Sequence, residues 1–579
     1  MNVSETTSLF ESIFPQAFEQ PRNKLAYGTA GFRMKADATL DRVVFTVGLL
    51  ACLRAIDRNE SVGVMITASH NGAQDNGVKL VDPTGEMLEA SWEEKAVRLA
   101  NCIHNSSLLA EKCNELISEL GLNLSADRKR ALCICIGSDT RDSSERLTRI
   151  LKSSISLFAK YGLFFVDYGL MITPQLHYMV MLSNTDTSKK ILSELTSNDK
   201  QSEVQNLFIG NEKTYYADLS QAFKSLVKGG KRKVNVDCAF GVGGKKIKEM
   251  AAILSDVIEF NLINDYETIG VVESQKYLNH DCGAEHVQKQ KAVPINCESF
   301  KELASIDGDG DRLVYYFVND NGELCLLDGD KIATLLVKFI GELLKTTNLI
   351  DQLIVGVVQT AYANGSSTTY LKEVLGSHRI FCVPTGVKYL HHKAKELDVG
   401  VYFEANGHGT VIFSDKANSA ISHMYNNRNN LETGVQQAIT NLYNLTKLIN
   451  PTVGDAFSDL LAVEAVLSYY SWSLRDWDAN LYCDVPSVQD KLRVKDRTII
   501  KTSKDETQVL SPDGIQEKIN QCVSKVKKGR AFIRPSGTED VVRVYAEAET
   551  NQEARDLAID VLHIIYNDLA GTEQPPSKL

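Results

Sequence analysis

Three aspartates alternate with glycines in the segment Asp307-Gly308-Asp309-Gly310-Asp311. Carboxylates this close together repel one another unless a cation lies among them. The glycines let the backbone curl so that all three carboxylates can face one point. Oxygen ligands of this kind select Mg²⁺ or a similar hard ion. We therefore expect a single magnesium site, held by Asp307, Asp309 and Asp311.

An EF-hand calcium loop is one alternative for aspartates at this spacing. It fails, because Arg312 stands where that loop needs glycine and Val318 where it needs a bidentate glutamate. A solvated acidic turn is the other alternative, and the apolar residues on both sides of the segment disfavour it.

A second polar segment, Thr67 to Asn71, follows the apolar run Val62 to Ile66, which predicts a short buried strand. In α/β proteins, the side chains at the ends of such strands form binding and catalytic sites. Ser69 is the candidate reactive hydroxyl, with His70 beside it and Lys79 shortly after. A serine at this position is more often a cap or a turn former, so its role depends on what the rest of the chain supplies.

A third segment, Arg534 to Thr538, lies between the predicted strands 530–533 and 541–547 and has the chemistry of an anion site. Its backbone N–H groups can form a nest for a phosphate. The hydroxyls of Ser536 and Thr538 add donors. Arg534, with Arg543 on the next strand, can bind phosphate bidentately. A hairpin turn with incidental polar residues is the alternative, but it would not need an arginine on each side.

Glu404, Asn406 and His408 alternate along a loop after a predicted strand. Carboxylate and amide groups together suit sugar hydroxyls, and a simple polar turn explains them equally well. Thr385 and Lys388, in a similar loop, could add a phosphate or hydroxyl contact.

Apolar runs that alternate with helical patterns must position these segments, and they predict parallel or mixed α/β sheets. We expect helices near 41–56, 92–120 and 144–159, and a linker or surface insertion over 184–206. The predicted fold is three consecutive α/β domains and a C-terminal α+β domain. The expected limits are 1–185 for the serine-bearing domain, 207–320 for the metal-binding domain, 321–455 for the sugar-recognition domain and 475–579 for the phosphate-binding domain.

Composition excludes several function classes. The chain has 579 residues, a formal charge of −11 and a pI near 5.6, which argues against a general nucleic-acid binder. The longest apolar run, 43–56, is too short to span a bilayer, so no membrane partner is expected. The 12 cysteines include no CxxC pair, and Cys133 and Cys135 have the pattern of core residues in one strand. A reducing compartment fits this usage.

Taken together, the motifs resemble those of the α-D-phosphohexomutase superfamily, and the resemblance covers nearly the whole chain. The run Phe403 to Gly409 is similar to the acetylhexosamine branch of that superfamily. The segments that carry the resemblance are Gly28 to Arg33, Thr67 to Asn71, Asp75 to Leu80, Asp307 to Arg312, Thr385 to Lys388, Glu404 to Thr410 and Arg534 to Glu547.

The resemblance implies four domains around a central cleft and a Ser69 that carries a phosphate in the active form. An oxygen of that phosphate would complete the magnesium site. The implied reaction interconverts N-acetylglucosamine 6-phosphate and N-acetylglucosamine 1-phosphate through a 1,6-bisphosphate, and so supplies UDP-N-acetylglucosamine synthesis. The implied substrate contacts are Thr385, Gly386, Lys388, Glu404, Asn406, His408, Arg534, Pro535, Ser536, Gly537, Thr538 and Arg543.

Two departures from the superfamily pattern matter. Many members have proline after Ser-His-Asn, whereas this chain has Gly72, which loosens the serine segment. Related hexose mutases have a histidine after Thr-Gly, whereas this chain has Val387 and then Lys388. Lys79 and Arg33 are then the candidates for the general acid or base, and Arg33 would also offset negative charge. His70 is expected to support the loop or contact phosphate.

Other functions stay open at this point. A glucose or mannose phosphomutase activity, alone or as a second activity, is the nearest alternative. A non-catalytic phosphosugar-binding protein is another, disfavoured by the intact Ser69 and the three aspartates. The oligomeric state is expected to be a monomer or a weak dimer.

The segment Ser577-Lys578-Leu579 has the form of a tripeptide address for peroxisome-type organelles, such as a glycosome. It predicts recognition by an import receptor. A cytoplasmic location is the alternative, in which the tripeptide is a coincidence.

Overall fold

The computed structural model describes residues 3–124, 131–194, 201–202, 205, 212–537 and 539–577. Its contacts divide the chain into two compact units. Unit 1 comprises Met1–Leu326 and Lys447–Ser468, and unit 2 comprises Leu327–Thr446 and Tyr469–Leu579. Within the described ranges, no helix is both long and apolar enough to cross a membrane.

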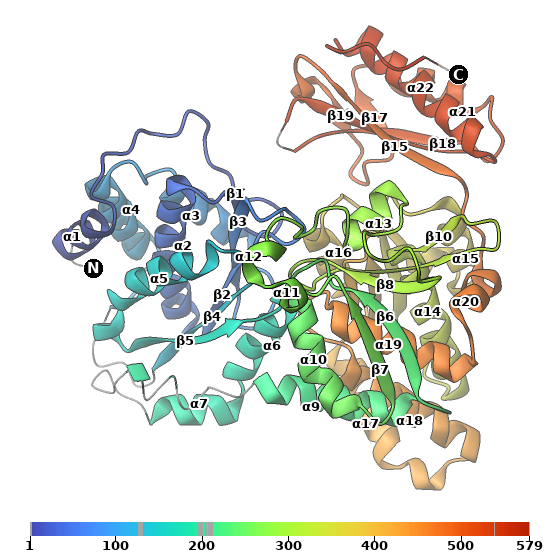
Figure 1. Cartoon of the computed structure of the whole chain (residues 1–579), viewed down its shortest axis with the longest axis horizontal. Helices are drawn as coiled ribbons and strands as arrows, with labels where there is room; N and C mark the ends of the chain where they lie inside the picture. The colour runs from blue at the N-terminus through green and yellow to red at the C-terminus, as the bar shows by residue number, and fades with distance from the viewer. Residues whose placement is uncertain are drawn as a thin grey trace. The chain divides into compact units, whose positions relative to one another are not determined.

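The first sheet of unit 1 has the strand order β1-β3-β2-β4-β5 (Figure 1). Strands β2, β4 and β5 run parallel, whereas β3 runs antiparallel to both of its neighbours, β2 and β1. The sheet is therefore mixed, as predicted. The strands are β1 Phe32–Lys35, β2 Val62–Ile66, β3 Asp75–Val81, β4 Leu132–Ser138 and β5 Leu163–Leu170.

Helices cover both faces of this sheet, so its central strands are buried on both sides. The helices α2 (Ala38–Arg58) and α5 (Ser144–Ser156) contact each other and strands β2 and β4, and α6 (Thr173–Ser183) also packs on β2 and β4. Cys133 and Cys135 are both 0% exposed, which confirms them as core residues of one strand. A helix as apolar around its circumference as α2 must be buried, and almost all of its residues are.

One helix prediction in unit 1 needs correction, and the predicted linker or surface insertion has a helix within it. The segment 92–120 forms two helices, α3 (Ala90–Ala100) and α4 (Ser106–Glu119), because Asn105 interrupts the helical run and caps α4 by accepting a hydrogen bond from Leu108 N. The predicted linker contains a helix, α7 (Asp186–Ser193), whereas 195–200, 203–204 and 206 lie outside the described residues.

The second sheet of unit 1 has the order β10-β9-β8-β6-β7, with β6, β7 and β8 parallel and β9 antiparallel to β8. The helix α19 (Ala456–Tyr470) returns to this unit, where its Glu464 accepts hydrogen bonds from Arg232 and Tyr315. The remaining elements are β6 Arg232–Asp237, β7 Ile258–Ile263, β8 Glu302–Ile306, β9 Leu313–Val318, β10 Leu324–Leu327, α9 Glu212–Leu226, α10 Gly243–Leu254, α11 Tyr266–Ile269, α12 Val271–Ser274 and α13 Ala284–Gln290.

Unit 2 contains a sheet of the same design, with the order β12-β11-β13-β14. Strands β11, β12 and β13 are parallel, and β14 is antiparallel to β13. Strands β11 to β14 thus repeat the chain order and neighbours of β6 to β9. The elements are β11 Val355–Thr360, β12 Ile380–Val383, β13 Val399–Phe403, β14 Gly409–Phe413, α14 Gly329–Thr346, α15 Gly365–Leu375, α16 Val387–Ala394, α17 Asp415–Asn426, α18 Thr433–Leu448 and α20 Leu474–Leu481.

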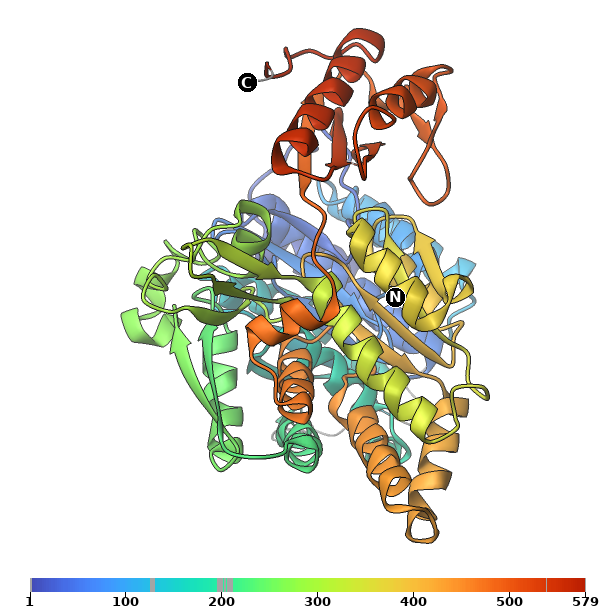
Figure 2. The ribbon, with the colours of Figure 1, turned by 90° about the vertical axis from the view of Figure 1, so that its right-hand side faces the viewer.

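The C-terminal part of unit 2 is the predicted α+β module. Its antiparallel sheet has the order β15-β19-β18, and helices α21 (Ile515–Val523) and α22 (Asn551–Asp568) contact each other and this sheet (Figure 2). Thr550 caps α22 by accepting a hydrogen bond from Glu553 N. The strands are β15 Ser487–Arg493, β16 Lys501–Thr502, β17 Val509–Ser511, β18 Arg530–Pro535 and β19 Val541–Glu547.

Three antiparallel hairpins carry the polar segments singled out by the sequence. The turn between β2 and β3 holds Ser69, that between β8 and β9 holds the three aspartates, and that between β13 and β14 holds Glu404 to His408. At each of these places the chain turns back into the same sheet instead of continuing into a helix. The fold class itself is confirmed: three α/β sheets and a C-terminal α+β domain.

Candidate functional site

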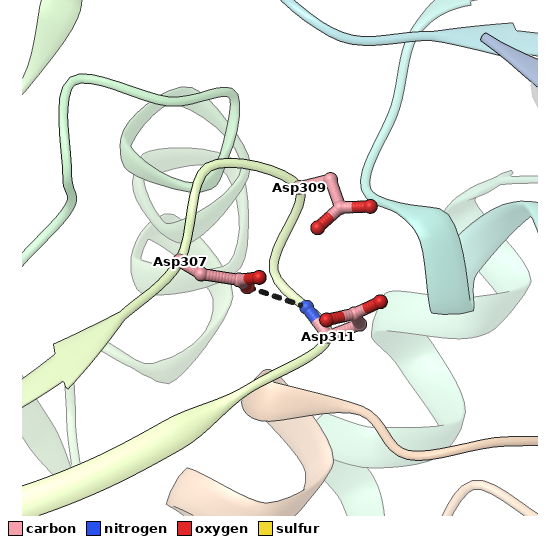
Figure 3. A group of neighbouring side chains, drawn as sticks. All are labelled: Asp307, Asp309 and Asp311. Carbon is pink, nitrogen blue, oxygen red and sulfur yellow. Dashed lines mark hydrogen bonds between the residues drawn. The ribbon is translucent and has the colours of Figure 1, made fainter. Parts of the chain in front are cut away.

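The three aspartates lie in one tight turn, and their carboxylates face a common space (Figure 3). Ligand oxygens from Asp307, Asp309 and Asp311 all lie within 4.8 Å of one another. Asp307 Oδ1 accepts hydrogen bonds from the backbone N–H groups of Asp311 at 3.0 Å and Arg312 at 3.2 Å. Gly310 has φ of 70°, a left-handed conformation that glycine adopts without strain, and this closes the turn.

Burial makes this cluster electrostatically demanding. Asp307 and Asp309 are 0% exposed and Asp311 is 6% exposed. Burial and the neighbouring carboxylates of Asp311 and Asp309 raise the pKa of Asp307 well above its ordinary value. Asp309 Oδ1 is buried and makes no hydrogen bond. Hard oxygen donors with an unsatisfied buried atom among them fit a divalent cation such as Mg²⁺.

Ser69 lies against this cluster. Its Oγ donates to Asp307 Oδ2 at 2.8 Å and is 3.4 Å from Asp311 Oδ1, and the residue is 5% exposed. Its φ of 51° is left-handed, a backbone conformation that costs a non-glycine residue about 1–3 kcal/mol. The surrounding structure therefore enforces the conformation of Ser69.

Lys79, on β3, faces the same cluster. Its Nζ donates to Asp309 Oδ2 at 2.9 Å and to Asp311 Oδ2 at 3.2 Å. Burial alone would lower the pKa of Lys79, but the carboxylates of Asp309 and Asp311 raise it above its ordinary value. Lys79 is thus a fixed positive charge in the site. It can donate a proton, but because it is already protonated it is not available as a general base.

Arg33, His70 and Arg312 form the rim of this site, together with Glu285 of α13. His70 Nε2 lies 3.1 Å from Glu285 Oε2 and 3.4 Å from Arg33 Nη1. Burial and the positive charges of Arg312 and Arg33 hold the pKa of His70 well below its ordinary value, so the ring is neutral. Arg312 Nε lies 3.8 Å from Asp311 Oδ1, and Arg312 Nη1 lies 3.8 Å from Glu285 Oε2. The structure therefore places all the predicted residues of the serine and acidic segments in one cluster.

The sequence reasoning missed several supports of this cluster. Thr173, at the start of α6, donates through its Oγ1 to Asp309 Oδ2 at 2.6 Å and through its N to Asp309 O at 2.9 Å. Thr67 Oγ1 accepts a hydrogen bond from Ser69 N at 2.9 Å and donates to Asp139 at 2.6 Å. Thr173 and Glu285 belong to no recognisable motif, whereas Asp139 stands in a polar loop at a strand end, the signal that drew attention to Ser69.

In unit 2, the predicted anion loop joins β18 to β19. Arg534 and Arg543 are direct partners across these two strands, so the two arginines start from neighbouring backbone positions. Ser536 N donates to Val541 O at 2.8 Å, and Gly537 O accepts from Arg497. Thr538 lies outside the described residues. The loop has the arginine pair that the sequence predicts.

A carboxylate already bridges this loop and the Thr385 loop. Glu506 Oε2 accepts hydrogen bonds from Thr385 N at 2.9 Å and from Thr385 Oγ1 at 2.5 Å, and its Oε1 accepts from Arg534 Nε at 3.0 Å. A backbone N–H, a hydroxyl and a guanidinium are the donors that phosphate uses. The carboxylate of Glu506 therefore accepts hydrogen bonds from donors of the predicted phosphate site and acts there as an internal anion. No motif in the sequence marks Glu506.

The third predicted loop is a compact turn after β13. Glu404 N donates to His408 O at 2.9 Å, and Asn406 Oδ1 accepts from His408 N at 3.0 Å. Asn406 Nδ2 lies 3.3 Å from Glu404 Oε2, which sets the amide beside the carboxylate. Gly386 directly precedes α16, and Lys388 lies in the first turn of that helix. Unit 1 thus contains the serine and acidic segments, and unit 2 the remaining predicted contacts, including Pro535.

Comparisons with known proteins agree along the chain. A family model described as phosphoacetylglucosamine mutase AMG1, domain III, matches residues 328–472. Two models of phosphoglucomutase/phosphomannomutase match as well: the alpha/beta/alpha domain I over residues 37–107 and the C-terminal domain over residues 491–564.

Whole-chain relatives are also similar. A phosphoacetylglucosamine mutase of Sus scrofa is 45% identical over 560 residues, which cover 95% of this chain and 96% of the relative. A crystal structure of an N-acetylglucosamine-phosphate mutase of the α-D-phosphohexomutase superfamily, in its product complex, is 40% identical with a TM-score of 0.84 and covers 98% of this chain and 100% of that chain. The N-acetylphosphoglucosamine mutase of Aspergillus fumigatus, in complex with GlcNAc-6P and magnesium, is 40% identical with a TM-score of 0.83, covering 97% and 98%.

We predict that magnesium stabilises the protein more strongly as the pH rises. Because its pKa is raised, Asp307 in the cation-free folded protein keeps a proton that the unfolded chain loses near its ordinary pKa, so stability falls as the pH rises between the two values. Mg²⁺ must displace that proton. In a pH series that starts near the ordinary pKa of an aspartate, the gain in thermal midpoint on adding Mg²⁺ should therefore become several degrees larger toward the alkaline end.

At a pH above the raised pKa of Asp307, its carboxylate is charged, and the variant Asp307→Asn removes that repelling charge. At that pH we expect its cation-free midpoint to lie above that of the wild type, and Mg²⁺ to change it little. Asp256→Asn, at an exposed aspartate of the same predicted domain, should behave as the wild type. An equal gain from Mg²⁺ in Asp307→Asn and the wild type would contradict the assignment of the cation site.

We predict that Glu506→Gln binds inorganic phosphate more tightly than the wild type. The amide keeps the size of the side chain but gives up the charge that pairs with Arg534, so a free anion meets less competition. The loss of one charge-assisted contact corresponds to roughly tenfold in the dissociation constant measured by calorimetry. Glu549→Gln, an exposed change in the same predicted domain, is the control. Weaker phosphate binding by Glu506→Gln would mean that Glu506 orients Arg534 rather than competing for it.

Proposed function

The chain belongs to the phosphoacetylglucosamine mutase family, and we propose that it performs the reaction of that family with Ser69 as its phosphate carrier. It interconverts N-acetylglucosamine 6-phosphate and N-acetylglucosamine 1-phosphate and so supplies UDP-N-acetylglucosamine synthesis. The enzyme is an intramolecular phosphotransferase of the isomerase class.

One observation carries this proposal: the hydroxyl of Ser69 lies 2.8 Å from Asp307 inside a buried cluster of three carboxylates. In a hydrolytic serine the neighbouring base is most often a histidine oriented by a third group, whereas the hydrogen bonds of Ser69 Oγ go to two carboxylates of a cluster that suits a cation. A cation held beside Ser69 would suit a phosphoserine, because it would neutralise the charge of the phosphate. Asp307, Asp309 and Asp311 would hold Mg²⁺, which when bound supplies charge neutralisation at the transferring phosphate.

The chemistry is two phosphoryl transfers with opposite direction. In the first, the bond between Ser69 Oγ and phosphorus breaks and a bond from phosphorus to the free sugar hydroxyl forms, which gives a 1,6-bisphosphate. The hydroxyl proton leaves to a group of the site or to solvent. In the second transfer, the other phosphate of the bisphosphate returns to Ser69 Oγ, and the sugar oxygen it leaves takes up a proton.

The side chains around Ser69 support this chemistry through charge and position. The Lys79 ammonium, which the pKa shift keeps protonated, can stabilise negative charge and donate a proton. Arg33 on the rim adds a second positive charge. The neutral His70 can support the serine segment through Glu285. Phosphoryl transfer depends on such positioning and charge neutralisation more than on new covalent chemistry.

The loops of unit 2 fit the non-reacting part of the substrate. The Arg534 and Arg543 pair, with Ser536 and Gly537, would hold whichever phosphate is not reacting. Glu404 and Asn406 would accept and donate hydrogen bonds to ring hydroxyls. Thr385 supplies a backbone N–H and a hydroxyl that already bind a carboxylate oxygen. A mutase must make such contacts with the sugar in either orientation.

We predict that Ser69→Ala abolishes turnover but leaves sugar-phosphate binding intact, because the oxygen that carries the phosphoryl group is gone while the anion loops are unchanged. A coupled assay of both N-acetylglucosamine phosphates with Mg²⁺, together with intact mass, measures this. The wild type should show turnover and the mass of one added phosphoryl group, and Ser69→Ala neither.

Ser153→Ala, at a half-buried serine of α5, is the matched control and should keep wild-type turnover. Wild-type-like turnover in Ser69→Ala would refute the phosphoserine mechanism. Much faster turnover of glucose 1-phosphate than of the acetylated substrate would refute the substrate assignment in favour of a hexose phosphomutase.

We also propose that a chain ending in Ser577-Lys578-Leu579 is imported into a peroxisome-type organelle. Lys578 and Leu579 lie outside the described residues, and the support is the tripeptide itself, which follows a segment containing two prolines. A fluorescent protein that carries residues 570–579 at its C-terminus should collect in those organelles, and the same fusion without 577–579 should not. A cytoplasmic signal from both fusions would refute the proposal.

A further inference from the structure

Two side chains from distant parts of the chain bind the same pair of carbonyl groups in the serine segment. Arg141 Nη2 donates to Ser69 O at 3.1 Å and to Asn71 O at 2.5 Å. Asn279 Nδ2 donates to the same two oxygens at 2.9 and 3.0 Å. Four hydrogen bonds thus converge on the two carbonyls that flank His70.

Both of these side chains are themselves firmly held. The Arg141 side chain is fully buried and pairs with Asp139, the acceptor of Thr67 Oγ1. Asn279 has a left-handed backbone, with φ of 56°, and its N–H donates to Ala239 O at 3.1 Å. They therefore act as fixed donors rather than as mobile surface groups.

The other end of the Asn279 amide binds the acidic segment. Gly308 N donates to Asn279 Oδ1 at 2.9 Å, so one side chain links the serine turn of the first sheet to the aspartate turn of the second. The contact leaves no space: a Cβ on Gly308 would lie 2.6 Å from Asn279 Nδ2 and 3.0 Å from Ser69 O. This packing explains why glycine follows Asp307.

The serine segment needs such external support. Ser69 is held in a left-handed conformation that few non-glycine residues adopt. Gly72 follows the segment, and glycine restricts its own backbone least of all residues. Peptide planes are rigid, so fixing the carbonyls of Ser69 and Asn71 restrains the backbone from which the Ser69 side chain projects, and the hydrogen bond to Asp307 Oδ2 then sets the direction of Oγ.

We propose that Asn279 and Arg141 are positioning residues for phosphoryl transfer: they hold the serine segment in register with the acidic segment, so that Ser69 Oγ faces the three carboxylates. Neither residue needs to touch the substrate. The catalytic part of this inference rests on the proposed function, whereas the restraint of the serine segment is a property of the protein alone.

The variant Asn279→Asp is the sharpest test, because it keeps the shape and the acceptor for Gly308 N but replaces the donor with a carboxylate oxygen facing two carbonyls. We expect kcat to fall on the order of 10²-fold, the effect of a small misplacement of a reacting group, with KM for the sugar phosphate changed less than about twofold. Hydrogen–deuterium exchange of the backbone amides in residues 68–72 should become faster.

Asn296→Asp is the matched control. Asn296 is an asparagine of the same predicted domain with a left-handed backbone (φ of 63°), and its amide donates to Asn264 instead of the serine segment. It should keep the kcat and the exchange pattern of the wild type.

Arg141→Lys provides a second reading if Asn279→Asp fails to fold, because it keeps the charge beside Asp139 but loses the fork that reaches two carbonyls. It should also lower kcat and speed exchange in residues 68–72. Wild-type kcat and wild-type exchange in either folded variant would overturn the proposal, as would an equal loss in Asn296→Asp. Absence of mutase turnover in the wild type would refute the proposed function, and the exchange measurement would still decide whether these residues hold the serine segment.

Discussion

The repulsion among three buried carboxylates is the constraint on which the reactive part of unit 1 depends. Two of the three aspartates, Asp307 and Asp309, are fully buried. Burial and the neighbouring carboxylates of Asp311 and Asp309 raise the pKa of Asp307. Such a cluster is tolerable only when positive charge and donors surround it. The neighbouring groups follow from this need: the ammonium of Lys79, the hydroxyl of Thr173, two backbone N–H groups and the hydroxyl of Ser69. A divalent cation among the three carboxylates would meet the same need, and an anionic group could then lie beside that cation.

The fold meets this demand by repeating one device. In each of three sheets, a parallel strand turns back as an antiparallel neighbour, and the turn carries functional side chains. A hairpin turn between two buried strands is held at both ends, so its side chains are placed more firmly than those of a free loop. The contacts of Ser69 and Lys79 with the aspartates join two such hairpins. In unit 2, the turn that holds Glu404 is built in the same way. Arg534 and Arg543 are partners across the two strands that the anion loop joins.

Local patterns in the sequence predicted what depends on local chemistry. The alternating aspartates, the serine after an apolar strand and the arginines on each side of a turn were each readable from residue type and spacing. Contacts made across the chain were not. Asn279 and Glu506 touch the predicted segments only after folding, and an isolated asparagine or glutamate has no periodicity to mark it. The strand order that the second and third sheets share could not be predicted either. It depends on which strands pair with one another, and the two segments have no similar run of residues that would reveal it.

The central claim is that the phosphoryl group on Ser69 is passed to the sugar and replaced by the sugar's own. Protein labelled on Ser69 with radioactive phosphate, by exchange with a labelled sugar bisphosphate, can be mixed with unlabelled N-acetylglucosamine 6-phosphate and Mg²⁺. The measurement is where the label goes over a single turnover. The account predicts that the label moves to the sugar phosphate while the protein keeps a phosphoryl group by mass. Label that stays on the protein during turnover, or leaves it only as inorganic phosphate, would contradict the account.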